Sequence, residues 1–365
     1  MEDRTGVKAT KRDRMLGALR RTLEGYVPWD INPCPSLLKQ WREHMGTDLH
    51  PQDYYDSDFR GVGIGTTTKK TDWRALNPDA PPDAQFGEAG TVHVPAASPE
   101  GHHFTHALPS ALRHATSVRD VERYPWPDLD ADYRWADVPK QVRQWHEKGY
   151  AVMAGVGGFF EGMSWMRGPD ETMMGLACDD PIMGAIVERT AVSTGMAAER
   201  MARAGADILQ FGDDIGMQDR MMLSPDLWRR WFKRPFDEAI RRAKAIRPDV
   251  LAFFHSDGFI EPVIPDLIEI GVDILNPVQP ECMDPEKIKT QYGDHLSFWG
   301  TIGVQSTMPF GTPQDIREIV RRRIEVVAKG GGLFLAPAHM LEPEVPLRNL
   351  LAFVEAMQEF GGLDA

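Results

Sequence analysis

The chain has 365 residues, and its apolar content of 42% and charged content of 26% are typical of a globular protein. The net charge of −13 argues against the basic face that nucleic-acid binding needs, so we expect no nucleic-acid partner. No apolar run approaches the roughly 20 residues that span a bilayer, and the charged N-terminus lacks the features of a signal peptide, which predicts a cytoplasmic protein with no membrane partner.

The first 110 residues change character after one clear helix. Thr10 to Leu23 predicts a helix with apolar residues on one face, and Tyr26–Asp30 follows as a short strand. From 33 to about 110 Pro and Gly are frequent, and two alternating runs at 90–94 and 102–108 flank a Ser-Pro-Glu-Gly turn, which predicts a hairpin. We predict that this range is an irregular insertion or lid, because it is short of apolar residues, and that it holds one further strand.

A regular strand–helix rhythm begins after Tyr124. The predicted strands are 151–156, 207–212, 250–254, 273–276, 296–300 and 332–336, and the predicted helices lie around 193–205, 226–246, 259–270, 284–291, 312–329 and 343–360. Repeated units of this kind indicate a parallel α/β architecture, and the two earlier strands bring the count to about eight. The absence of a GxGxxG turn and of a P-loop disfavours a nucleotide-binding sheet. The sequence therefore predicts a single (β/α)8 TIM-type barrel over 1–365.

Polar side chains follow every predicted barrel strand. In chain order these residues are Glu161, Trp165 and Arg167; Asp213, Asp214 and Gln218; His255 and Asp257; Asn276, Gln279 and Cys282; Thr301 and Gln305; and His339. The residues that follow the strands of a TIM-type barrel carry its active site. Two imidazoles and a carboxylate, from His255, Asp257 and His339, suit a three-ligand metal site with an open position. Without a metal, the same groups would serve as general acid and base.

Each of these residues also has a structural interpretation. Asp213 or Asp214 would cap the next segment, Glu161 would form an ion pair with Arg167, and Cys282 would be an inert thiol. The histidines and carboxylates of the rim would satisfy one another's hydrogen bonds. Methionines between 159 and 174 either fill the core or form an adaptable wall for a large or planar ligand.

Several longer motifs occur in a fixed order along the chain. They are Phe211-Gly-Asp-Asp-Ile-Gly-Met-Gln218, Leu223–Trp228, His255-Ser-Asp-Gly258, Ile264–Gln279, Phe298–Gln305 and Pro337–Asn349. Together they resemble the uroporphyrinogen decarboxylase-like (URO-D) superfamily, over roughly 10–30 and 150–360. The resemblance implies a TIM-type barrel. It also implies one of two activities, since the superfamily includes the haem-pathway decarboxylase and cobamide-dependent methyltransferases.

The two branches of this superfamily make different demands on the barrel rim. The decarboxylase holds its carboxylate-rich substrate with arginines in an R-x-x-G-R stretch, where this chain reads Trp29-Asp-Ile-Asn-Pro-Cys34. The methyltransferases bind zinc through an H-x-C pair and a later cysteine. By this resemblance His255 matches the first ligand, whereas Asp257 and His339 stand where the two cysteines would be. Such a harder ligand set suits activation of an oxygen, as in demethylation of a methoxylated compound.

The resemblance therefore predicts a methyl-transferring, demethylating enzyme with a divalent metal, zinc, at His255, Asp257 and His339. The candidate catalytic residues, which would orient the substrate, are Asp214, Glu161 and Gln218, and the candidate substrate-binding residues are Phe159, Trp165, Arg167, Asn276 and Gln279. A corrinoid or tetrahydrofolate would accept the methyl group of a small-molecule substrate. Because the chain has no D-x-H-x-x-G corrinoid signature, a cobamide would arrive on a separate corrinoid protein.

Two other hypotheses stay open at this point. One is a metal-free decarboxylase that acts on a small carboxylated substrate, with Asp214 or Asp257 stabilising a protonated intermediate. The other is a barrel that only binds a tetrapyrrole or corrinoid. Exposed apolar residues on the helices would also allow a homodimer, although nothing in the sequence specifies one.

Overall fold

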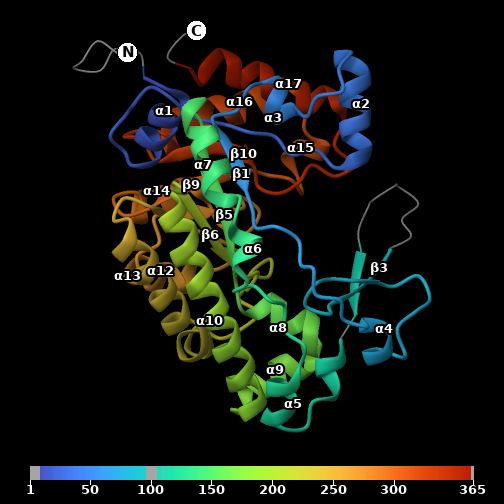
Figure 1. The fold of residues 1–365 in the computed structure, drawn as a ribbon. Helices are drawn as coiled ribbons and strands as arrows, with labels where there is room; N and C mark the ends of the chain where they lie inside the picture. The colour runs from blue at the N-terminus through green and yellow to red at the C-terminus, as the bar shows by residue number, and fades with distance from the viewer. Residues whose placement is uncertain (1–8, 96–104, 109, 363–365) are drawn as a thin grey trace.

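The computed structural model describes residues 9–95, 105–108 and 110–362. Seven parallel strands in the described part of the chain form one curved sheet, in the order β1-β5-β6-β7-β8-β9-β10 (Figure 1). Their bounds are β1 Phe59–Val62, β5 Ala151–Gly157, β6 Ile208–Gly212, β7 Leu251–His255, β8 Ile274–Asn276, β9 Ser297–Ile302 and β10 Leu333–Pro337. Each strand pairs with the next one along the chain, as strand–helix repeats require.

The residues before β1 lie between the two edge strands, β10 and β1. Trp29 forms an isolated parallel bridge with Leu335 of β10, and the Leu335 N–H donates to the Pro28 carbonyl at 2.9 Å. On the other side, the Ser57 hydroxyl, just before β1, donates to the Asp30 carboxylate at 3.0 Å. The predicted early strand is thus reduced to a single bridge, because a proline has no N–H to give to a ladder. With this segment the sheet is a TIM-type barrel, as predicted.

Helices cover the outside of the barrel and extend beyond it. Their bounds are α1 Lys11–Leu19, α2 Pro35–Met45, α3 Pro51–Tyr54, α4 Trp73–Leu76, α5 Val118–Arg123, α6 Asp132–Trp135, α7 Val138–Glu147, α8 Phe160–Arg167, α9 Pro169–Ala177, α10 Pro181–Ala204, α11 Pro225–Trp228, α12 Arg234–Ile246, α13 Ile264–Glu269, α14 Pro285–Tyr292, α15 Thr307–Phe310, α16 Pro313–Arg322 and α17 Leu347–Phe360. In Figure 1, α5, α8 and α9 gather at the end of the molecule remote from α1 and α17. None of the helices in the described ranges is long and apolar enough to cross a membrane.

The helix predicted at 193–205 begins much earlier than expected, at Pro181. The signal for this start is present in the sequence. The side chain of Asp180 accepts a hydrogen bond from the Ile182 N–H, and Pro181 occupies the first helical turn. The predicted helix at 226–246 forms as α11 and α12, joined by a π-helical segment at Arg229–Lys233.

The range 33–110 contains β1 of the barrel and a separate three-stranded antiparallel sheet. This sheet consists of β2 (Gln85–Phe86), β3 (Val92–Pro95) and β4 (Thr105–Leu108). The predicted hairpin is confirmed where β3 pairs with β4, whereas its turn at 98–101 and residues 102–104 lie outside the described residues. The small sheet lies to one side of the barrel in Figure 1, and its role as a lid stays a prediction.

α1 fills the barrel interior at the end where the strands begin, here called the lower end. Met15, Leu16 and Leu19 on its apolar face join one buried cluster with inward-facing strand residues. Those strand residues are Ala151, Ile208, Leu251, Phe253, Ile274, Trp299, Phe334 and Ala336. The lower barrel is therefore a packed core, which leaves only the opposite end, where the strands terminate, available for a site.

A buried ion network holds α1 against this lower end. The Asp207 carboxylate, which is fully buried, is 2.8 Å from Arg12 of α1 and 2.7 Å from Arg247. It also accepts a hydrogen bond from the Val152 N–H at 2.9 Å and lies 2.9 Å from His146 Nε2. Burial would raise the pKa of Asp207, but the two guanidinium groups and the Val152 N–H hold it below its usual value. The network ties α1 to α7, to β5, and to the residues just before β6 and just after α12.

Candidate active site

Alternation along β7 points its last residue into the barrel mouth. Leu251 and Phe253 belong to the interior cluster that α1 fills. Ala252 and Phe254 pack instead in the larger cluster shared with the surrounding helices. Because successive side chains of a strand face opposite sides, His255 faces the interior, above Phe253.

The inward-facing strand ends line a cavity of about 330 Å³, here called the mouth cavity. Its lining residues are Asp30, Ile31, Asn32, Phe59, Met153, Gln210, Phe253, His255, Asn276, Trp299, Ala336, Pro337, Ala338, His339 and Met340. They come from all seven strands of the curved sheet, from residues 30–32 of the segment that closes the barrel, and from the residues that follow β10. The volume is at the lower end of the range of ligand pockets and suits a small molecule.

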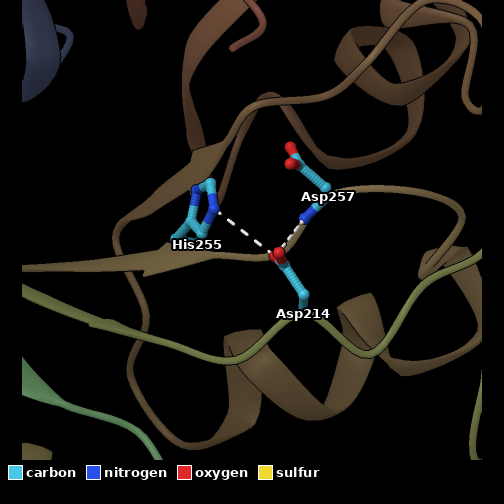
Figure 2. A group of neighbouring side chains, drawn as sticks. All are labelled: Asp214, His255 and Asp257. Atoms are coloured by element: carbon cyan, nitrogen blue, oxygen red, sulfur yellow. Dashed lines mark hydrogen bonds and ion pairs between the residues drawn. The ribbon is translucent and has the colours of Figure 1, made fainter. Parts of the chain in front are cut away.

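Three side chains meet at the edge of this cavity, at the ends of β6 and β7 (Figure 2). Each of Asp214, His255 and Asp257 offers one ligand atom, and these atoms all lie within 4.8 Å of one another. We call this group the Asp–His–Asp cluster. His255 Nε2 is 3.4 Å from the Asp214 carboxylate, which also accepts the Asp257 backbone N–H at 2.8 Å. The structure therefore brings together two of the three predicted metal ligands and adds Asp214.

Asn276 determines which nitrogen of His255 faces the cluster. His255 Nδ1 is 2.5 Å from the Asn276 side-chain oxygen. The amide nitrogen of Asn276 donates to the Trp299 carbonyl at 2.9 Å, so its oxygen must be the acceptor for His255. Nδ1 therefore carries a proton, and Nε2 is the nitrogen that faces Asp214. A hydrogen bond of this kind orients metal-binding histidines in many proteins.

A positive charge would stabilise the Asp257 carboxylate. Its Oδ1 is buried and has no hydrogen-bond partner among the described residues, while Oδ2 lies 3.9 Å from His339 Nε2. Burial and the charge of Asp214 raise the pKa of Asp257, and His255 and His339 oppose that rise. His339 thus lies beside the cluster, in contact with Asp257 and not with the other two ligands.

Two acidic residues next to the cluster have different environments. The buried carboxyl of Asp213 accepts the N–H groups of Phe159 and Glu161, at 2.6 and 3.2 Å, and so caps α8, which precedes it in the chain, and not the next segment as predicted. Burial raises the pKa of Asp213 to about 7. Glu161 is half-buried, and burial followed by the charge of Asp214 raises its pKa. The Glu161 carboxyl group therefore belongs to the surroundings of the cluster.

Gln218 and Gln279 line a second cavity, of about 390 Å³, which shares Asp257 and His339 with the site. Gln218 donates to the Glu281 carbonyl at 3.1 Å, and the Gln279 side-chain oxygen accepts the Gly258 N–H at 3.4 Å. Cys282 also lines this side cavity, and burial raises the pKa of its thiol to about 11. The thiol is protonated at neutral pH, which supports its interpretation as an inert residue.

Three predicted substrate-binding residues around α8 are directed elsewhere in the structure. Phe159 is fully buried, and its ring packs against Phe236, 4.6 Å between centroids. The guanidinium of Arg167 donates to the carbonyls of Leu112 and Ala115, and no ion pair with Glu161 is present among the described residues. Trp165 is exposed, and its ring lies 6.1 Å from that of His93. None of the three lines the mouth cavity.

Sequence reasoning missed three polar residues of the mouth cavity, Asp30, Asn32 and Gln210. Asp30 ends the early strand that the sequence did predict, so the rule applied to the other strand ends would have found it. Gln210 lies within β6, two residues after Ile208 of the interior cluster. Strand alternation alone would have turned it inward.

The comparisons with known proteins identify the family of this barrel. The family model for uroporphyrinogen decarboxylase (URO-D) matches residues 102–360. The chain belongs to this family. The predicted superfamily is thereby confirmed, and the motifs that carried the resemblance from Phe211 to Asn349 all lie within the matched range.

Several similar proteins carry methyltransferase names. Two methylcobamide:CoM methyltransferases MtaA, from Methanosarcina barkeri and its strain Fusaro / DSM 804, are 26% and 24% identical over 163 residues. These matches cover 45% of this chain and 44% of each relative, so they span less than half of those proteins. A solved methyltransferase from Methanosarcina mazei shares the fold, with a TM-score of 0.65 at 18% identity over 97% of this chain and 100% of that one. The matches agree with the predicted methyltransferase branch.

Proposed function

We propose that this URO-D protein transfers a methyl group from a methylated small molecule to a corrinoid acceptor, with a divalent metal, zinc, in the Asp–His–Asp cluster. The cluster itself is the observation that carries the proposal. The names of the curated relatives, methylcobamide:CoM methyltransferases, support a corrinoid over tetrahydrofolate as the acceptor. Such a corrinoid would be carried by a separate protein.

The residues of the cluster fit a metal ion in three respects. Their donor atoms converge within 4.8 Å. His255 turns Nε2 toward the two carboxylates because Asn276 holds its other nitrogen. The unpartnered Oδ1 of Asp257 is a buried acceptor, which costs free energy unless a cation or donor satisfies it. One histidine and two carboxylates also suit zinc with an open coordination position.

Each residue near the cluster has a separate task in this proposal. When bound, the metal would supply Lewis acidity to a heteroatom of the substrate or acceptor. Asp214 is held in place by the Asp257 N–H, and His339 lies 3.9 Å from the Asp257 carboxylate, which it positions. Glu161, half-buried beside Asp214, would orient the substrate. Gln218, which faces the side cavity, would contact only a ligand that reaches beyond the mouth cavity.

The mouth cavity gives less support to the two alternative functions. A carboxylated substrate of a decarboxylase would require cationic partners, yet none of the described residues that line the cavity is Lys or Arg. A tetrapyrrole is also much larger than a small-molecule cavity of about 330 Å³. We therefore retain methyl transfer as the proposal.

Metal analysis of the purified protein tests the cluster directly. We expect about one zinc ion per chain in the wild type and almost none in His255→Ala, since each ligand of a three-residue site is needed. His44→Ala, which removes an exposed histidine of α2, is the matched control and should keep its metal. Metal content at background in the wild type, or unchanged in His255→Ala, would remove the metal from the proposal.

A spectroscopic assay tests the reaction. Reduced cob(I)alamin is mixed with the zinc-loaded protein and a panel of methoxylated and N-methylated compounds, and formation of methylcobalamin is followed by its visible spectrum. We expect methyl transfer with at least one donor, and its loss in both His255→Ala and Asp257→Asn. Transfer of equal rate in these variants would refute the assignment of the cluster, and release of carbon dioxide without methyl transfer would favour the decarboxylase alternative.

A further inference from the structure

The wall of the mouth cavity opposite the cluster carries a carboxylate of its own. The segment that closes the barrel, which contains Trp29 and Asp30, is three strands away from β7 in either direction around the barrel. On one side these strands are β1, β5 and β6, and on the other side they are β8, β9 and β10. Asp30 at the end of that segment and His255 at the end of β7 are therefore diametrically opposed, and both line the mouth cavity. A ligand that touches the cluster at one end has Asp30 at its other end.

The Asp30 carboxylate is anchored by hydrogen bonds, and it forms no ion pair within the described part of the chain. It accepts hydrogen bonds from the Ser57 hydroxyl, at 3.0 Å, and from the backbone at Ile31. The charge of Arg60 acts on it from a distance, since that guanidinium donates to the Ser57 and Phe59 carbonyls, each at 2.7 Å, and pairs with Asp53. Burial, opposed by these interactions, raises the pKa of Asp30 to about 7. A cation in the cavity would relieve the cost of that buried charge.

Aromatic rings form the floor and one wall between Asp30 and the cluster. Phe59, Phe253 and Trp299 line the cavity, and the ring of Trp299 lies 5.2 Å from Phe59 and 5.4 Å from Phe253 in edge-to-face arrangements. Aromatic rings attract alkylammonium groups through their negative faces. Asp30 is the sole carboxylate, and no Lys or Arg is present, among the described residues of the lining.

We propose that the mouth cavity takes a small molecule with an alkylammonium group at the end remote from the Asp–His–Asp cluster, held between Asp30 and the rings of Phe59 and Trp299. The opposite end of the molecule carries a heteroatom that reaches the cluster. This assignment of substrate class rests on the proposed function for the role of that second end. The ammonium site itself depends only on the cavity wall, so it is testable without metal or turnover.

Calorimetric titration with choline and its neutral isostere 3,3-dimethylbutan-1-ol tests the charge of the ligand. Both have the same shape, and both carry a hydroxyl for the cluster. We expect choline to bind the wild type about 10- to 100-fold more tightly than the alcohol, because only choline carries the positive charge that Asp30 and the aromatic rings attract. Equal binding of the two compounds, or no binding of choline to the folded wild type, would overturn the proposal.

Variants locate the site. Asp30→Asn should weaken choline binding by a similar factor and leave the alcohol unaffected, and Phe59→Leu, a second and independent variant, should weaken choline alone by a smaller factor. Asp219→Asn removes an exposed carboxylate outside the cavity and is the matched control for net charge. Unchanged choline affinity in both cavity variants refutes the site.

Tetramethylammonium separates this proposal from the proposed function. It has no heteroatom for a metal, so we expect it to bind the chelator-treated full-length protein in an Asp30-dependent manner. Such binding together with absent methyl transfer would support the ammonium site and count against the reaction. Zinc-dependent methyl transfer from neutral donors alone, with no binding of tetramethylammonium, would support the reaction and refute the ammonium site.

Discussion

Removal of the Asn276 side-chain oxygen tests how the cluster is organised. In Asn276→Leu the volume is nearly kept, but His255 Nδ1 loses the acceptor that lies 2.5 Å away. The ring is then free to rotate and to place its proton on Nε2, the nitrogen that faces Asp214. Loss of such an orienting partner typically weakens metal binding 10- to 100-fold, or by about 1.4–2.7 kcal/mol. We expect a loss of this size for zinc.

The assay is a zinc titration in competition with a chromophoric chelator, with circular dichroism to verify the fold. Asn276→Asp is the informative companion, because it keeps the acceptor for Nδ1 and adds the negative charge found beside many zinc-bound histidines, so its zinc affinity should equal or exceed that of the wild type. Wild-type affinity in Asn276→Leu would refute the orienting role. Equal losses in both variants would point to general disruption of the end of β8.

Three further predictions concern stability, measured as the free energy of unfolding in urea. Asp207→Asn should lower the free energy of unfolding by about 3 kcal/mol at pH 7, because two guanidinium groups lose a buried partner. The fold lowers the pKa of Asp207, so this loss should shrink as the pH falls below 3.8, the pKa of the unfolded carboxyl. A loss that persists unchanged at low pH would contradict the ionic explanation. Asp30→Asn should stabilise the protein by about 1–3 kcal/mol at pH 8, because the pKa of Asp30 is about 7 in the fold and 3.8 in the unfolded chain. This gain in stability should vanish below pH 4. A gain that does not depend on pH would contradict the explanation by ionisation of Asp30. Gly158→Ala should destabilise by about 3 kcal/mol or more, since the added Cβ would lie 1.8 Å from the Gly212 carbonyl oxygen, and a change below 1 kcal/mol, on the order of an ordinary surface substitution, would show that the backbone yields there.

Local pattern located six of the seven sheet strands, β5 to β10, because each is built around a short run of apolar residues. β1 (Phe59–Val62) is not such a run, and the sequence predicted only that 33–110 holds a strand. The Leu251–His255 run and the helices from Pro225 onward, apart from the short α15, have their predicted places within a few residues. The early strand at Trp29 is the exception, since its ladder depends on a neighbour, β10, that lies some 300 residues away in the sequence. A pattern within five residues cannot report whether that neighbour supplies more than one bridge.

The candidate site divides in the same way. Parallel strands end at one rim, so the sequence by itself determined that His255, Asp257, Asn276 and His339 would meet there. Only the tertiary structure decided what each side chain does at the rim. Asp213 caps α8, while its neighbour Asp214 faces His255.

The structure also directs Arg167 toward the carbonyls of Leu112 and Ala115, away from the cavity. Closure of the ring sets Asp30 across the mouth from His255, because it places the first and the fifth positions opposite each other. Direction along a strand is a local property, which alternation encodes. Opposition across a barrel exists only after the chain has closed, and this is why the sequence revealed one wall of the site and the structure revealed the other.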